Sequence, residues 1–580
     1  MRFLHGLLVV CSIFASPVRA QGGAEPSATD AVRALDDWLA LYLAGKLDIS
    51  QQDRLRGRVN QAKAFVSVKH GLSSERDVPR LNHVAELRLI CATIAKADDA
   101  RAAAALLRVA AVGLDSHPYK PEMAPPSVRS IGEEFAARLN SKDALDAVVA
   151  VATSGTGAAR GSLARQAAAL KILGRGDAEN HRALLQAALA HAEADVRLGA
   201  ADALVSAKLP AAVEALAAAA AAEGDERVAV RLLDALTATL GMRGADVDEA
   251  GRSAALSAAL GVLERHDWRA QLAACDTLAV ARSARSVPVL IGILERYHGR
   301  GARPVGSKAS NLVPTRAHEA LRSLTGAVFG VEQPDQWRAW WDGAQATFVL
   351  AEAKPAAATV VDDSAATSTA KFFGVPVTGT RVVFVVDISG SMNFQFASST
   401  ATVTQASTRQ PTAESKWDVA ERELQRALAA LPAESSFNAV YFSLRADAWK
   451  PKVVAATAAH RKTFLADLAK RRPDGGTNVW AALQLALGMR TLGYGDPLAN
   501  DIDEIFLLSD GAPSVGEVVD PQQILGLVRA ANQVNRVRIN TIFIGSEDEE
   551  QGGRGPRFGM SGVELMRRLA AENGGRFVRQ

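Results

Sequence analysis

Beyond about residue 378, short β-branched or aromatic runs alternate with runs of helical periodicity, and this alternation restricts the fold more than any other feature. Arg381 to Val386 is typical of a buried central strand. Further strands are predicted at residues 437–442, 504–508, 538–544 and 576–578, and helices at 417–431, 460–471, 479–491, 521–535 and 562–573. Strands separated by helices form a mainly parallel sheet covered on both faces. Residues 379–580 are therefore predicted to be a doubly wound, Rossmann-like α/β domain.

Five polar residues stand where this fold places its ligands, in loops at the carboxyl ends of strands. Asp387, Ser389 and Ser391 follow the first strand with alternate spacing, which points three oxygen-bearing side chains into one loop. Thr477 lies at a predicted helix start, and Asp510 follows the strand at 504–508. We expect these five side chains to converge on one site.

The D-x-S-x-S run, the Thr and the Asp occur in the order typical of the von Willebrand factor A (VWA) family. Residues 379–580 thus resemble a VWA domain with a metal-ion-dependent adhesion site. The resemblance implies that Ser389, Ser391 and Thr477 contact a cation through hydroxyls, and that Asp387 and Asp510 hold it directly or through water. It also implies that a carboxylate of a protein partner completes the coordination shell.

The donor types independently favour a hard cation, because hydroxyl, carboxylate and water oxygens suit Mg²⁺, with Mn²⁺ or Ca²⁺ as alternatives. Two possibilities besides a metal site are open at this point. Ser and Asp after a strand often only cap the next helix, and a family fold can retain the motif without binding metal.

An Ala- and Leu-rich helical region precedes this domain. Leu170, Leu204, Leu236 and Leu278 end recurring elements 34, 32 and 42 positions apart, by subtraction of their numbers, a spacing typical of paired-helix repeats. We predict a HEAT-like α-solenoid over residues 145–350, with a non-repeating helical bundle as the alternative. Residues 21–144 are predicted to be a further helical region, and residues 351–378 a flexible linker.

The first twenty residues are typical of a signal peptide cleaved after Ala20, with Arg2 before the apolar run from Leu7 to Phe14. No later segment is apolar enough to span a bilayer, so we expect a periplasmic or secreted protein. Basic and acidic residues number 66 and 63, which gives no electrostatic reason to expect nucleic acid as a partner. Cys91 and Cys275 remain after cleavage, either as buried free thiols or as one bridge.

These observations favour a protein-binding or adhesion function over catalysis. Of the ten histidines, only His460 lies beyond residue 318. The chain has neither an H-E-x-x-H motif nor a phosphate-binding loop with Lys. The helical repeats offer a second contact surface for a protein. The alternatives are a structural envelope or matrix component that self-associates, and a metal-dependent hydrolase. The Ser-, Thr- and Gln-rich stretch 392–413 is either a mobile rim of the binding face or a tolerated insertion.

Overall fold

The computed structural model describes residues 27–46, 83–112, 125–154, 160–176, 178–242, 247–299, 309–352, 370–396, 414–489, 501–516, 518–545 and 560–580. The predicted signal peptide, most of the predicted linker and residues 397–413 lie outside these ranges. The chain divides into two compact units, residues 1–207 with 490–496 and residues 208–489 with 497–580. This division falls inside the region predicted as one solenoid.

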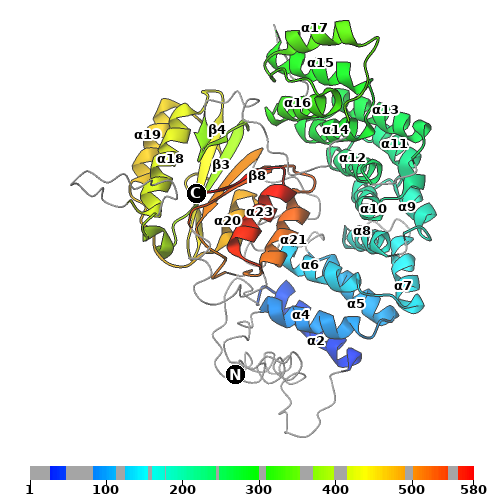
Figure 1. Ribbon diagram of the computed structural model, residues 1–580. Coiled ribbons are helices and arrows are strands. Elements are labelled where there is room, and N and C mark those ends of the chain that lie inside the picture. The colour runs from blue at the N-terminus through cyan, green and yellow to red at the C-terminus, as the bar shows by residue number, and fades with distance from the viewer. Residues whose placement is uncertain are drawn as a thin grey trace. The chain divides into compact units, whose positions relative to one another are not determined.

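The first unit is entirely helical in its described part (Figure 1). Its helices are α2 (Ala28–Leu43), α4 (His83–Ala95), α5 (Ala100–Ala110), α6 (Pro125–Ala136), α7 (Lys142–Ala152), α8 (Arg160–Arg175), α9 (Arg182–Ala188) and α10 (Ala194–Ala207). Asp99 and Ser141 accept hydrogen bonds from backbone N–H groups of α5 and α7, which satisfies donors that a helix start otherwise leaves unpaired. The helical prediction for this region is confirmed.

The second unit begins with a stack of helices. They are η2 (Pro210–Ala212), α11 (Val213–Ala222), α12 (Glu226–Leu240), α13 (Glu249–Arg265), α14 (Trp268–Ala281), α15 (Ser286–His298), α16 (Leu312–Thr325) and α17 (Pro334–Ala344). Helix α11 packs on α13, α12 on α14, α14 on α16 and α15 on α17. Consecutive helices also pack in pairs, α11 on α12, α13 on α14 and α15 on α16, as stacked helix pairs require. Membership of the HEAT family itself stays a prediction.

The predicted α/β domain follows and is confirmed as a doubly wound fold. Its strands are β3 (Arg381–Asp387), β4 (Ser436–Phe442), β5 (Ala446–Ala448), β6 (Val454–Ala455), β7 (Glu504–Ser509), β8 (Arg538–Phe543) and β9 (Phe577–Arg579). The sheet order is β5-β4-β3-β7-β8-β9, with β6 also paired to β4. Strands β4, β3, β7, β8 and β9 are parallel, whereas β5 and β6 are antiparallel to β4. Strands β5 and β6 were not predicted, because strands of three and two residues are too short to show an alternation of apolar and polar residues.

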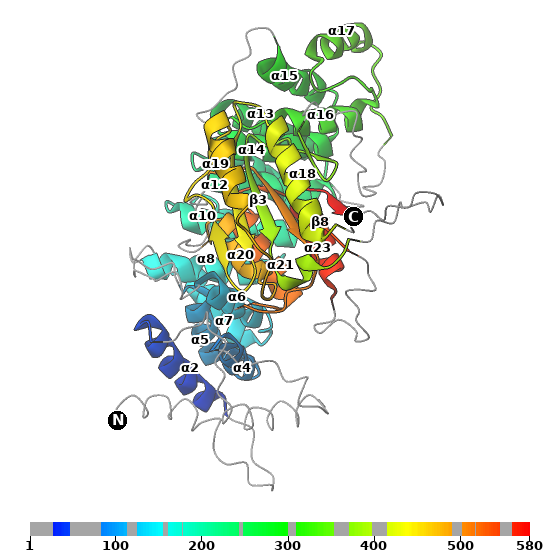
Figure 2. The ribbon, with the colours of Figure 1, turned by 90° about the vertical axis from the view of Figure 1, so that its left-hand side faces the viewer.

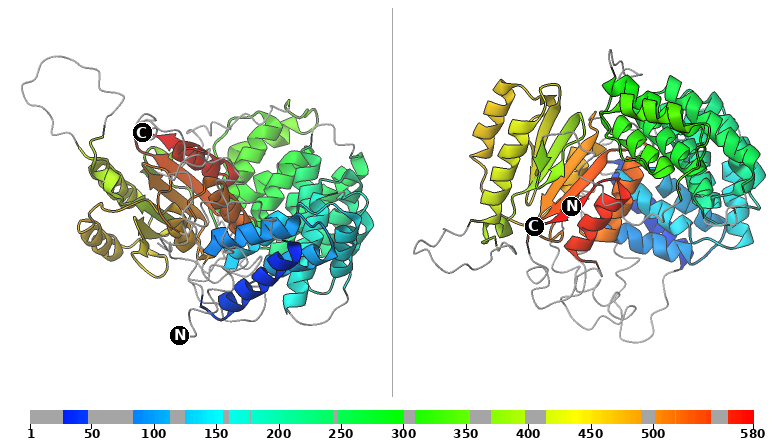
Figure 3. Two further views of the ribbon diagram at one scale, coloured as in Figure 1. Left: turned by 90° about the horizontal axis from the view of Figure 1, so that it is seen from below. Right: turned by 45° about the horizontal axis from the view of Figure 1, so that its top comes forward.

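Helices cover both faces of this sheet. They are η4 (Gly390–Asn393), α18 (Lys416–Ala430), α19 (Ala458–Leu468), α20 (Val479–Ala486), α21 (Pro521–Asn532) and α23 (Gly562–Glu572). Figure 2 views the sheet from the side of α18 and α19, and Figure 3 shows α23 on the opposite face. Helices α19 and α21 end at Leu468 and Asn532, each three residues before the predicted end, because the chain leaves both helices through tight turns.

Alternate residues of the central strand supply two separate cores. Val382, Phe384 and Val386 of β3 pack with residues of α18 and α19, while Val383 and Val385 are buried on the other face. With both faces covered, the strand is apolar from Val382 to Val386. Its polar residues, Arg381 and Asp387, lie at the two ends of the strand.

The prediction of a linker over residues 351–378 is wrong at its C-terminal end. Strands β1 (Lys371–Phe372) and β2 (Val375–Pro376) form an antiparallel hairpin. Phe372 is fully buried, and its ring contacts those of Phe384 and Phe506 edge-on at 5.3 and 5.9 Å. Aromatic burial of this kind fixes the hairpin to the sheet. The packed domain thus begins at Ala370 rather than at Gly379.

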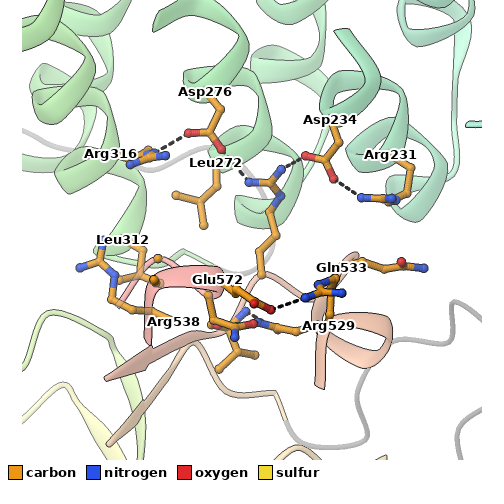
Figure 4. A pocket seen from close by; sticks show the side chains of 16 residues that line it. Arg231, Asp234, Leu272, Asp276, Leu312, Arg316, Arg529, Gln533, Arg538 and Glu572 are labelled. Atoms are coloured by element: carbon orange, nitrogen blue, oxygen red, sulfur yellow. Dashed lines mark hydrogen bonds and ion pairs between the residues drawn. The ribbon is translucent and has the colours of Figure 1, made fainter. Parts of the chain in front are cut away.

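Within the second unit, the helical stack and the sheet meet through ion pairs. Arg536, in the turn before β8, donates to Asp276 of α14 at 2.8 Å and also bonds Asp234 of α12. Figure 4 shows these two aspartates projecting from the helices toward the sheet side of a cavity of about 420 Å³. Ser310 also donates to Asp503, which precedes β7, at 2.9 Å. These contacts lie at the amino ends of the parallel strands, so they leave the carboxyl ends uncovered by α12 and α14.

Aromatic residues at the end of the helical stack pack together. Trp337 is fully buried and contacts Trp340 edge-on at 6.0 Å, and Phe348 contacts Trp341 at 5.1 Å. The cluster buries aromatic surface on and after α17 and so stabilises the end of the helical stack.

Candidate metal site

The first motif loop begins at the last residue of the central strand. Asp387 ends β3 and is completely buried, and Ser389 is 1% exposed. The Asp387 carboxylate accepts a hydrogen bond from the Ser389 backbone N–H at 2.7 Å. This bond turns the chain sharply after the strand and directs the following side chains over the end of the sheet.

Four of the five predicted residues form one hydrogen-bonded group. The hydroxyls of Ser389 and Ser391 lie 3.1 Å apart, and Ser391 donates to Oδ1 of Asp510 at 2.7 Å. Strands β3 and β7 are direct neighbours in the sheet, which places their carboxyl ends side by side. The register of the parallel sheet therefore joins residues separated by more than a hundred positions.

Thr477 lies in a loop that is tied to the first. The N–H of Gly390 donates to the Gly475 carbonyl at 3.0 Å, and the N–H of Asp474 donates to the Ile388 carbonyl at 2.8 Å. Thr477 is 6% exposed, and its own N–H donates to the Ser514 hydroxyl at 2.9 Å. No described hydrogen bond links its side chain directly to the other four residues.

The electrostatics of the group favour a bound cation. Burial raises the pKa of Asp387 to about 7, and the charge of Asp510 adds to this rise, although hydrogen bonds from Ser509 and Ser389 oppose it. A carboxylate buried beside a second carboxylate is stabilised when a cation lies between them. Hydroxyl and carboxylate oxygens are also the donors that Mg²⁺ accepts. The residues present therefore fit a hard divalent cation.

Sequence reasoning missed two residues that contact this group. Ser509, the last residue of β7, donates to Oδ2 of Asp387 at 2.5 Å. Lys416, the first residue of α18, places its ammonium 3.0 Å from Oδ2 of Asp510. Ser509 directly precedes a motif residue and could have been suspected from that position. Lys416 follows the long polar stretch, and nothing in its sequence position indicated that its side chain turns inward.

Two exposed apolar side chains flank the motif loops. Phe394 is 64% exposed and follows η4, and Leu444, 58% exposed, approaches Gly475. The side chain of Asn393 donates to the Pro473 carbonyl at 3.0 Å. This bond joins the segment after the first motif to the loop that carries Thr477. Phe396, two residues after Phe394, is instead partly buried against the core of the domain. Most of the stretch 392–413, from residue 397 on, lies outside the described residues.

Across the described ranges, no group of three or more His, Cys, Asp or Glu residues is arranged to hold a metal ion. The mixed carboxylate and hydroxyl group is thus the metal-site candidate in that part of the chain. Cys91 and Cys275 are both buried and free, in agreement with the first of the two alternatives.

Comparison with protein families gives a match over residues 401–576 to the family described as "von Willebrand factor type A domain". The C-terminal part of this chain contains a VWA domain. The matched range includes Thr477 and Asp510 but begins after Ser391. The order of the sheet and the position of the motif loops agree with this assignment.

Relatives and solved structures match the chain over a limited part. "Inter-alpha-trypsin inhibitor heavy chain H2" from Sus scrofa is 31% identical over 150 residues, which are 24% of this chain and 13% of that protein. "Inter alpha-trypsin inhibitor, heavy chain 4" from Mus musculus is 30% identical over 159 residues, 27% of this chain and 15% of that protein. A solved von Willebrand factor type A protein from Catenulispora acidiphila is 17% identical, with a TM-score of 0.25, over 35% of this chain and 38% of its own. The chain thus spans only about one seventh of these curated relatives.

Proposed function

We propose that this protein is exported and binds a protein partner through a divalent cation, with Mg²⁺ as first choice, held by its VWA domain. The observation that carries the proposal is the group of buried Asp387, Ser389 and Asp510 and half-buried Ser391, joined by hydrogen bonds at the ends of two adjacent parallel strands. The backbone pairing of β3 with β7 does not require these polar side chains. Their grouping at the strand ends is therefore better explained by a ligand than by the sheet.

Asp387, Ser389, Ser391, Thr477 and Asp510 would hold the cation. When bound, the cation supplies an electropositive position that a carboxylate of the partner completes. Phe394 and Leu444 then offer apolar contact beside that carboxylate, since both are largely exposed. Exposed aromatic and aliphatic side chains next to a polar anchor are typical of protein-binding surfaces.

Binding is favoured over metal-dependent hydrolysis because the histidine in the described part of the α/β domain does not reach the site. The ring of His460 bonds the Ala455 carbonyl of β6 at 2.8 Å. Strand β6 pairs with the amino end of β4, which is the end of the sheet away from the motif loops. His460 is therefore too remote to exchange protons at the site.

Export is supported by the sequence of residues 1–20. In the part of the chain that the structure describes, no helix is long and apolar enough to cross a membrane. The helical pairs are proposed as a second protein-contact surface, because a stack of repeats presents an extended face.

Calorimetric titration with MgCl₂ tests the proposal, using the full mature chain and its Asp387→Ala variant. We expect saturable binding to the wild type and none to the variant. Asp447→Ala is the matched control, because this aspartate lies on the exposed strand β5, and it should bind like the wild type. Equal titration curves for wild type and Asp387→Ala would refute the proposed site. Light scattering with and without chelator distinguishes a partner-binding protein from one that self-associates.

A further inference from the structure

Lys416 is an unusual neighbour for a cation site. Its side chain is 3% exposed, and the Asp510 side chain it contacts is 1% exposed. Burying an ion pair costs the desolvation free energy of both charges, and removing one partner leaves the other charge buried and uncompensated. The lysine is thus part of the interior of the site rather than a surface residue folded over it.

The position of Lys416 in its helix also indicates that this residue belongs to the site. Ser415 caps α18 in a reciprocal capping box with Asp418, so Lys416 is the first helical residue. A cation in the first turn opposes the helix dipole. Its location therefore does not stabilise α18, and the contact with Asp510 explains it instead.

The backbone around Lys416 holds this arrangement in place. Its N–H donates to the Phe394 carbonyl at 3.0 Å, and Gln395 forms an isolated bridge with Ser415. The chain that leaves the first motif is thereby fastened to the helix start. The backbone of Lys416 is thus fixed beside the motif loop.

Both carboxylate oxygens of Asp510 are engaged in the structure. Oδ1 accepts from Ser391 and Oδ2 accepts from Lys416. A cation can use a remaining lone pair of either oxygen as a direct ligand, or it can reach Asp510 through water. In either case the ammonium repels the incoming cation from close range.

We infer that Lys416 is a built-in counter-ion that lowers the affinity of the site for divalent cations and leaves the loaded site with net positive charge. When both aspartates are ionised, they and the ammonium carry a single net negative charge, and a divalent cation reverses its sign. Without Lys416 the loaded site is neutral. The lysine thus weakens cation binding while strengthening the attraction for a partner's carboxylate. This inference rests on the proposed cation site but concerns a residue outside the predicted ligand set.

The test is MgCl₂ titration of the full mature chain by calorimetry, comparing wild type, Lys416→Met and Lys462→Met. Lys462 lies exposed on α19 and controls for loss of a distant charge. We expect Lys416→Met to bind at least about tenfold more tightly than wild type, with Lys462→Met unchanged. Equal or weaker binding by Lys416→Met overturns the inference.

Folding of the variant provides a second readout. Because Lys416→Met leaves two buried carboxylates without a cation, its melting temperature should rise more between EDTA and MgCl₂ than that of wild type. Lys416→Gln, which keeps a hydrogen-bond donor for Asp510, serves if the methionine variant does not fold. An equal rise in wild type and the variant that folds contradicts the inference.

The outcomes separate the two proposals. If Asp387→Ala abolishes binding but Lys416→Met leaves it unchanged, the cation site stands and the role of Lys416 fails. If wild type shows no binding and Lys416→Met binds, the lysine acts as inferred but the native chain does not use a divalent cation. If no protein binds, both proposals fail.

Discussion

Ser509 donates its hydroxyl hydrogen to Oδ2 of Asp387 at 2.5 Å, across the ends of two neighbouring parallel strands. The opposite oxygen of the same carboxylate accepts the Ser389 N–H. Asp387 is therefore held in one orientation by two donors from different strand ends. Residues that orient a metal ligand in this way affect affinity although they do not touch the metal.

Ser509→Ala should weaken Mg²⁺ binding by roughly tenfold, because Asp387 loses one of the donors that orient it. Calorimetric titration measures the change. Thr463→Ala removes a hydroxyl from the exposed surface of α19 and should leave the affinity unchanged. An affinity of Ser509→Ala equal to that of wild type would show that Ser389 alone orients the carboxylate.

Gly475→Ala should also weaken Mg²⁺ binding. Gly475 has a φ of +83°, and an added Cβ would lie 2.9 Å from Cγ of Leu444. The left-handed backbone costs a residue with a side chain about 1–2 kcal/mol, so the loop shifts and its bond to Gly390 is disturbed. Gly511→Ala is the matched control, since an added Cβ there meets nothing within 4 Å. Comparable titrations of the two alanine variants would contradict this prediction.

Arg536→Met should destabilise the second unit by about 3 kcal/mol, because it removes a cation from between buried carboxylates. The side chains of Arg536 and Asp276 are 18% and 15% exposed. Urea unfolding measures the loss. Because Arg536 and Asp276 are in direct contact, the double variant Arg536→Met/Asp276→Asn should lose less stability than the sum of the losses of the two single variants. A destabilisation under about 0.5 kcal/mol, the range of surface substitutions, would show that the pair contributes little.

The same ion pairs predict a pH dependence. Burial alone would raise the pKa of Asp276, but the guanidiniums of Arg316 and Arg536 outweigh it and hold the pKa below the ordinary 3.8. The carboxylate therefore contributes stability that is complete above pH 3.8 and is lost as the pH falls toward the folded-state value. Between pH 5 and pH 3, wild type should lose more free energy of unfolding than Asp276→Asn. Parallel pH profiles would contradict the prediction.

Cys91 and Cys275 should both be unreactive in the folded protein. Burial raises the pKa of the Cys91 and Cys275 thiols to about 12. At pH 8 they are therefore protonated, and the thiolate is the reactive form. A chromogenic disulfide reagent should label neither thiol in the native chain from Gln21 on, and both in denaturant. Rapid labelling without denaturant would show that at least one thiol is accessible.

Much of the α/β domain could be predicted because its signals are local. The apolar run from Arg381 to Val386 and its polar end at Asp387 follow from burial on both faces of a parallel sheet. The hairpin at 371–376 and strands β5 and β6 could not be predicted, since each is too short for periodicity. Their positions depend on pairing with each other or with β4, which no local pattern encodes.

The sequence by itself determined which oxygen-bearing residues stand at strand ends, and hence the candidate ligands Asp387, Ser389, Ser391, Thr477 and Asp510. Only the tertiary structure decided how they are held and what charge surrounds them. Sheet order brings Ser509 to Asp387, and helix packing brings Lys416 to Asp510. The physical reason is that periodicity and loop position are properties of neighbouring residues, whereas the charge of a buried site is set by side chains that meet only when distant segments pack.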